Sequence, residues 1–88
     1  MFEALKNNYK ASFTEKIQLL EDALKQNGTQ ELFKHVHRLT GSSGSYGFMD
    51  IYACAQALED KIINSQNITD ELITGTEELI NLLQKNKA

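Results

Sequence analysis

The sequence has 88 residues, a formal net charge of −3, one cysteine and no proline, a length that suits one domain, residues 1–88, with a single modest core. The scattered lysines and arginines lack the basic stripe of nucleic-acid-binding proteins, and no apolar run approaches the roughly 18 residues of a membrane span. Because the lone Cys54 excludes an internal disulfide and the N-terminus lacks the plan of a signal peptide, we expect a cytoplasmic protein. We also expect a monomer that binds neither nucleic acid nor membrane.

The first helical pattern runs from Phe2 to Gln26, where apolar residues recur every three or four positions, the spacing of one helical face. This spacing predicts one long helix, or a short entry helix followed by a second segment that Thr14 caps. We expect Asn27-Gly28 to end the helix, since glycine tolerates the left-handed conformation favoured just past a C-terminus. The expected buried residues are Leu5, Tyr9, Phe13, Ile17, Leu20 and Leu24.

Further helical patterns follow, separated by short polar links. The second helix is predicted to begin with Thr29 as its N-cap and to end in a turn between Gly44 and Gly47. The third begins at about Phe48, and Thr69 opens the fourth, whose tail, residues 84–88, we expect to fray. The expected buried residues are Leu32, Val36, Leu39 and Ser43 in the second helix, Ile51, Ala55, Leu58 and Ile62 in the third, and Leu72, Thr76, Leu79 and Leu83 in the fourth.

Four amphipathic helices with short links are most simply arranged as an all-α, antiparallel, up-down-up-down four-helix bundle, to which a short N-terminal helix segment can be added. The composition agrees, because it lacks proline and is rich in Leu, Ile, Ala, Lys, Glu and Gln. The sequence has no alternating strand pattern and no internal repeat.

His37 is predicted to lie outside the buried stripe of the second helix, roughly 130° from its centre by helical rotation. Phe33 falls one turn before it on the same side, and Gly41 and Gly44 fall one and two turns after it. Glycine inside a helix costs about 1 kcal/mol relative to alanine, so two such glycines indicate a packing or functional reason. The pattern therefore indicates an exposed imidazole beside a surface with little side-chain bulk, which a large partner could approach.

Other chemistries fit the sequence less well. Residues 41–47 are rich in glycine and serine, but a helix precedes them and no Lys-Ser/Thr follows, unlike a phosphate-binding P-loop. His35 and His37 point about 160° apart on a helix, so they cannot share a metal ion like an i, i+4 pair. Cys54 has no identifiable histidine base and is interpreted as a packing residue. A neutral imidazole is a good nucleophile near pH 7, so His37 could accept and donate a phosphoryl group if a partner supplies the remaining chemistry.

The run Val36–Gly47 resembles the phosphoacceptor motif of histidine-containing phosphotransfer (HPt) domains, approximately His-x-Leu-Lys-Gly-Ser/Ala-Ser/Ala followed by a glycine. Downstream, Gly47, Ile51 and Leu58-Glu59 look like the third helix of that family, and Phe13–Leu24 looks like its first core helix. The resemblance thus covers nearly the whole chain. One departure is Thr40, which stands where the family usually has a lysine.

The resemblance implies a phosphocarrier of two-component phosphorelays rather than an enzyme, with no cofactor or metal of its own. His37 would carry the phosphoryl group between receiver domains of response regulators or hybrid sensor kinases, whose Asp and Mg²⁺ assist the transfer. Gly41 and Gly44 would make room for the partner, and Lys34 and Arg38 would neutralise charge. The candidate docking contacts are Phe33, Thr40 and Phe48. Thr40 keeps an alternative open, an adaptor that docks receiver domains without phosphate turnover.

Overall fold

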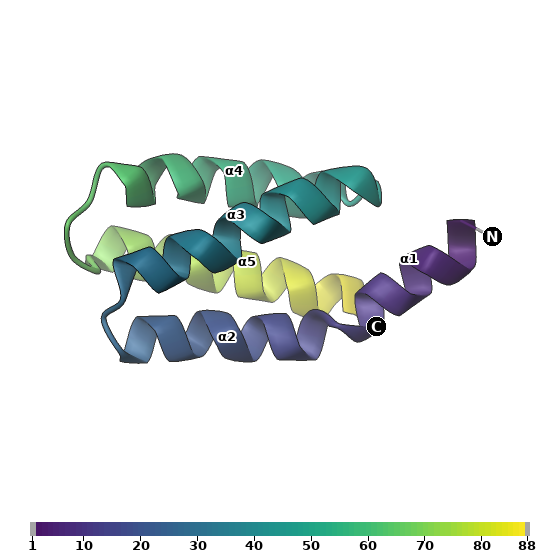
Figure 1. The fold of residues 1–88 in the computed structure, drawn as a ribbon, viewed down its shortest axis with the longest axis horizontal. Helices are drawn as coiled ribbons and strands as arrows, with labels where there is room; N and C mark the ends of the chain where they lie inside the picture. The colour runs from purple at the N-terminus through teal and green to yellow at the C-terminus, as the bar shows by residue number, and fades with distance from the viewer. Residues whose placement is uncertain (1, 88) are drawn as a thin grey trace.

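Five helices make up the chain in the computed structural model, which describes residues 2–87. The helices are α1 (Phe2–Ala11), α2 (Phe13–Lys25), α3 (Thr29–Ser45), α4 (Met49–Ile63) and α5 (Asp70–Lys87). Figure 1 shows α2 to α5 side by side along the long axis of the molecule, with the ribbon reversing direction at each link. Because α2 contacts α3, α3 contacts α4, α4 contacts α5 and α5 contacts α2, the four helices close into a bundle. The predicted all-α fold with four packed helices is confirmed.

The short N-terminal segment is a separate helix, α1, which extends beyond the end of the bundle in Figure 1. The break between α1 and α2 falls at Ser12, whose Oγ donates a hydrogen bond to the carbonyl of Tyr9 at 2.6 Å. Thr14 lies inside α2, so the predicted cap at Thr14 is wrong. Leu5 is also not buried as predicted, because α1 extends beyond the end of the bundle and leaves this side chain 53% exposed.

The end of α2 differs from the prediction by one residue. Asn27, not Gly28, adopts the left-handed conformation, with φ of 54°. The backbone amide of Gly28 then donates to the carbonyl of Ala23 at 3.0 Å, which satisfies a carbonyl of the last helical turn. Gly28 is the N-cap of α3 and Thr29 is its first residue, so the predicted N-cap at Thr29 is wrong. Asparagine tolerates this conformation because its short polar side chain can hydrogen-bond locally.

The turn after α3 depends on Gly47, whose φ of 81° favours glycine. The amide of Gly47 donates to the carbonyl of Gly44 at 3.3 Å, and the amide of Phe48 donates to the carbonyl of Ser43 at 2.9 Å. These two bonds form the Schellman arrangement that ends many helices. The turn directs Phe48 into the core, where its ring packs 5.5 Å from that of Phe13.

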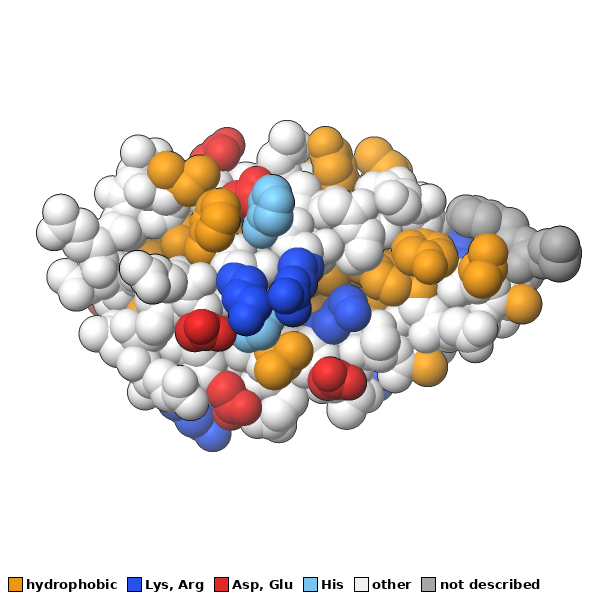
Figure 2. Space-filling view, in the orientation of Figure 1, with side chains coloured by type: hydrophobic (Ala, Val, Ile, Leu, Met, Phe, Trp, Pro, Cys, Tyr) orange, Lys and Arg blue, Asp and Glu red, His pale blue; other side chains and the backbone are white. Residues whose placement is uncertain are grey.

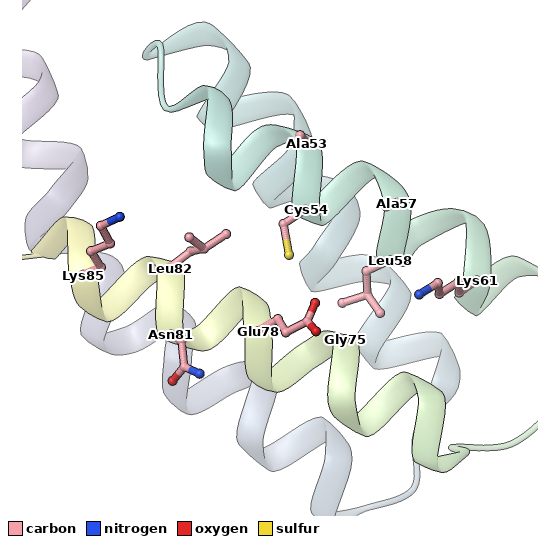
Figure 3. Close-up of a pocket in the computed structure, with 10 residues that line it drawn as sticks. All are labelled: Ala53, Cys54, Ala57, Leu58, Lys61, Gly75, Glu78, Asn81, Leu82 and Lys85. Carbon is pink, nitrogen blue, oxygen red and sulfur yellow. The ribbon is translucent and has the colours of Figure 1, made fainter.

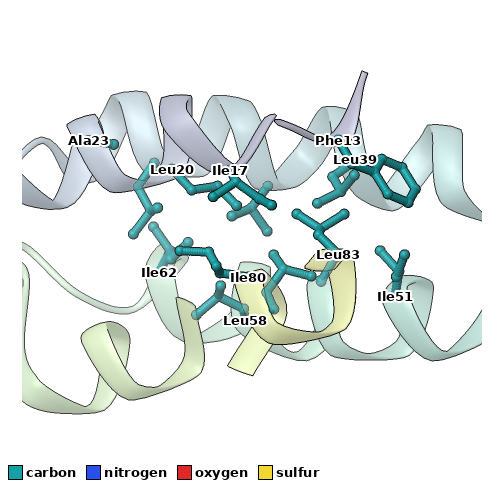
Figure 4. Packing of buried hydrophobic residues seen from close by; sticks show 14 of the residues in the cluster. Phe13, Ile17, Leu20, Ala23, Leu39, Ile51, Leu58, Ile62, Ile80 and Leu83 are labelled. Carbon is teal, nitrogen blue, oxygen red and sulfur yellow. The ribbon is translucent and has the colours of Figure 1, made fainter. Parts of the chain in front are cut away.

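The core lies along the axis of the bundle, where side chains from α2, α3, α4 and α5 meet (Figure 4). Every residue predicted to be buried in α3, α4 and α5 is buried. Ser43 and Thr76 are tolerated there because their hydroxyls donate to carbonyls one turn earlier in their own helices, at 2.6 and 2.7 Å. Residues 84–87, which were predicted to fray, are part of helix α5, and residue 88 lies outside the described residues. No helix within residues 2–87 is long and apolar enough to cross a membrane.

Candidate functional site

The imidazole of His37 lies on the side of α3 that faces away from the core, with 68% of the side chain exposed. This is the exposure that the helical spacing predicted. Phe33, one turn earlier on α3, stacks on the imidazole with ring centroids 5.6 Å apart and ring planes 13° apart. The two rings restrain each other, so the imidazole is presented to solvent in a defined orientation rather than as a free side chain.

A carboxylate from the next helix holds one nitrogen of this imidazole. Nδ1 of His37 lies 2.5 Å from Oε1 of Glu59 on α4, whose side chain is only 15% exposed. Because an ionised carboxylate only accepts hydrogen bonds, Nδ1 donates, and the neutral ring then has its lone pair on Nε2. Nε2 makes no hydrogen bond to another group within residues 2–87. In this tautomer the free lone pair of the ring is on Nε2.

Glu59 was not among the site residues predicted from the sequence. Helical periodicity cannot indicate a contact between residues 22 positions apart on different helices. Without its partner, Glu59 looks like an ordinary surface carboxylate on α4. Only the register of α3 against α4 could have suggested the contact. That register is visible in the structure: Phe33, His37 and Gly44, in order along α3, lie beside Ile63, Glu59 and Tyr52, in reverse order along α4.

The two glycines beside His37 differ in their surroundings. A methyl group added at Gly41 would have no neighbour within 4 Å, so the surface next to His37 is open there. A methyl group added at Gly44 would lie 3.1 Å from the ring of Tyr52 on α4. Gly44 therefore lets α4 pack closely against α3, which is an internal reason for glycine, whereas the bundle gives no such reason at Gly41.

Positive charge gathers on α3 beside His37, although the whole chain is acidic. Lys34 and Arg38 are exposed and lie one turn apart on α3, and neither forms an ion pair within residues 2–87. Lys16 of α2 lines the same small hollow as Arg38. Figure 2 shows Lys and Arg side chains close together beside a histidine on this face. These cations could attract an anionic group that approaches the imidazole.

Two predicted docking contacts have surroundings that the sequence did not indicate. Thr40 is half-buried, and its Oγ1 donates to the carbonyl of Val36 at 3.0 Å, so the hydroxyl is occupied within α3. Phe48 is only 7% exposed and packs against Tyr9 and Phe13. Burial therefore removes Phe48 from the docking contacts, because the Gly47 turn directs its ring into the core.

A larger hollow of about 610 Å³ lies between α4 and α5, away from this site (Figure 3). Cys54 lies in it with small neighbours such as Ala57 and Gly75, and no residue of α3 lines it. Burial raises the pKa of the Cys54 thiol, and the charge of Glu78 raises it further. Cys54 packs against the hydrophobic core, in agreement with its interpretation as a packing residue. No group of three or more His, Cys, Asp or Glu within the described residues could hold a metal ion.

The chain matches the family model of the Hpt domain over residues 4–86. That range contains α2 to α4 in full, and with them His37, Glu59 and the two cations on α3. No curated protein and no solved structure matches the chain.

Proposed function

Because the chain belongs to the Hpt domain family, whose members are phosphocarriers in phosphorelays with receiver domains, we propose that His37 is its phosphoacceptor. It accepts a phosphoryl group from a receiver-domain aspartate, or from a hybrid kinase, and passes it to a response regulator. The observation that carries this proposal is the exposed imidazole whose Nδ1 is bound by Glu59 while Nε2 is left without a partner. The chain acts as a carrier, and the partner supplies the aspartate and Mg²⁺.

The hydrogen bond to Glu59 decides which nitrogen reacts. Nε2 of His37 attacks the phosphorus of an aspartyl phosphate, the phosphorus–nitrogen bond forms, and the bond to the acyl oxygen breaks. The electron pair leaves with the aspartate carboxylate. The ring keeps its proton on Nδ1 and becomes cationic, and the carboxylate of Glu59 lies 2.5 Å from that nitrogen, where the charge develops. When an acceptor aspartate attacks the phosphorus, the lone pair returns to Nε2 without net proton transfer.

The remaining residues act on the incoming phosphoryl group. Lys34 and Arg38 add positive charge on the His37 side of the encounter, at exposed positions where salt screens the attraction. Gly41 keeps the adjacent surface clear, since a side chain there would project into open space next to the imidazole. Thr40, at the position of the family lysine, contributes no charge and hydrogen-bonds within its own helix.

The proposal is tested by labelling with a phosphorylated receiver domain and, separately, with phosphoramidate as a small donor. Wild type and His35→Gln should be labelled, and His37→Gln should not. His35 is the matched control because it lies on the same helix but points into a different hollow, with only 16% of its side chain exposed. The adduct should be labile in acid and stable in alkali, as a phosphorus–nitrogen bond requires. Labelling that persists in His37→Gln would refute the assignment, and receiver binding without labelling of wild type would indicate the adaptor instead.

A further inference from the structure

We propose that the hollow between Phe33 and Ile63 receives an apolar side chain of the receiver partner, and that this contact positions the phosphoaspartate over His37. The hollow has a volume of about 520 Å³ and lies between the first half of α3 and the last turn of α4. The inference rests on the proposed function for the identity of the partner, and it adds a docking residue, Ile63, that neither the motif nor the helical spacing indicates.

The hollow is continuous with the phosphoacceptor site. Phe33 and His37 are one turn apart on α3, and Glu59 and Ile63 are one turn apart on α4. The two helices run antiparallel at this point. Phe33 therefore lies across from Ile63, one helical turn from the place where His37 lies across from Glu59. Phe33 belongs to both places, since its ring stacks on the imidazole and also lines the hollow. Figure 2 shows hydrophobic side chains directly beside the exposed histidine.

Ile63 is 64% exposed, the largest exposed fraction among the large hydrophobic side chains described. A single exposed isoleucine is ordinary on a protein surface. The position of Ile63 is unusual, because it borders a hollow that is also lined by the buried Ile62 and by Phe33. The remaining lining residues are polar without charge: Thr29, Gln30, Ser65 and Gln66. A site of this composition suits an apolar side chain and offers a charged one no ion pair.

The size of an ordinary protein interface indicates which molecule fills the hollow. A specific interface buries about 800 Å² on each partner, so its footprint extends well beyond one side chain. A receiver domain whose phosphoaspartate reaches Nε2 of His37 must therefore cover Phe33, whose ring is 5.6 Å from the imidazole, and the hollow beside it. Lys34 and Arg38 are exposed on α3 outside the hollow lining. The matching receiver face thus has an apolar side chain on one side of its phosphoaspartate and carboxylates on another.

The experiment compares Ile63→Gln with Met49→Gln, using receiver domains chosen for their binding to wild type. Met49 is the matched control, because it lies on the same helix, is 58% exposed, and stands ten residues, or about 15 Å, from Glu59. Both side chains are exposed, so both variants should keep the wild-type helical circular dichroism. Ile63→Gln should weaken receiver binding about tenfold, as loss of an apolar anchor does, and should slow phosphotransfer from the receiver in proportion. Met49→Gln and the apolar Ile63→Leu should bind like wild type.

Phosphoramidate separates docking from chemistry, because this small donor needs no docking surface. Labelling of His37 by phosphoramidate should be unchanged in Ile63→Gln. If Ile63→Gln and Met49→Gln bind receivers equally well, the proposed docking site is wrong. This holds whether both variants bind like wild type or both are weakened to the same extent. If instead wild type binds receivers through Ile63 but is never labelled at His37, the docking site stands and the carrier function fails.

Discussion

Nδ1 of His37 and Oε1 of Glu59 lie 2.5 Å apart, across the interface of α3 and α4. The imidazole is largely exposed, whereas the carboxylate is largely buried between the helices. The less mobile partner therefore sets the orientation of the more exposed one. The bond also selects the tautomer with the proton on Nδ1.

Glu59→Ala should slow phosphoramidate labelling of His37 by about tenfold, because a hydrogen bond to a charged group is worth about 1.5 kcal/mol at the low end. Glu59→Gln should slow it less, since the amide oxygen can still accept from Nδ1. Asp60→Ala is the control, an exposed carboxylate on the next residue. Nitrogen-15 NMR of the ring should show a proton on Nδ1 in wild type, and a population shift toward protonated Nε2 in Glu59→Ala. A wild-type ring protonated mainly on Nε2 would contradict the assigned geometry.

Three glycines within helices should respond differently to alanine. Gly41→Ala should stabilise the fold by about 1 kcal/mol, because alanine is the better helix former and the new methyl group meets nothing. Gly44→Ala should gain less, since its methyl group would press on Tyr52 at 3.1 Å. Gly75→Ala should be the least stable of the three, because its methyl group would lie 2.9 Å from the buried Leu58. Urea unfolding gives this order, and a Gly41→Ala variant less stable than wild type would contradict it.

Gly41→Gln should weaken receiver binding without weakening the fold. The helix should be no less stable than in wild type, because the side chain projects into open space. Receiver binding should fall, since the glutamine would occupy surface one turn from His37 that the partner must approach. Calorimetric titration with a receiver domain measures the change. Unchanged affinity would mean that the partner does not cover Gly41.

Thr40→Lys should stabilise the phosphorylated form modestly. The lysine would add a positive charge one turn from His37, worth about 1 kcal/mol or less where its charged end reaches solvent and is screened. The half-life of the phosphohistidine, or its equilibrium with a phosphorylated receiver, should rise accordingly and fall back in high salt. Thr74→Lys, on the exposed surface of α5, is the control for added charge elsewhere. An equal effect from both substitutions would show that net charge, not position, is responsible.

Cys54 should react slowly with thiol reagents near neutral pH. Burial raises the pKa of its thiol, so less of the reactive thiolate is present than for a free cysteine, and the reaction rate should keep rising above pH 9. The raised pKa also makes the stability of the fold depend on pH. A pKa raised in the folded state contributes stability below the unfolded pKa, and this contribution is lost as pH rises through the folded pKa. Cys54→Ala should remove that loss. Labelling kinetics as rapid as those of a free thiol would contradict the burial.

The periodicity of the sequence by itself determined which faces of α3, α4 and α5 are buried, and thereby the exposure of His37. This works because the rotation per residue of a helix is a local property, so spacing alone assigns each side chain to a face. The motif around His37 is likewise contiguous in sequence, and the match over residues 4–86 agrees with the resemblance found there.

Only the tertiary structure decided what stands across from each face. The pairing of His37 with Glu59, the hollow between Phe33 and Ile63, and the contact of Gly44 with Tyr52 all depend on the register between two helices. That register is set by the packing of the whole core, because a shift of one turn would leave every helical face as hydrophobic as before while changing all of its partners. The burial of Phe48 agrees with its spacing, since it stands three residues before Ile51 on the buried face of α4. What only the structure decided is that the Gly47 turn packs its ring against Tyr9 and Phe13.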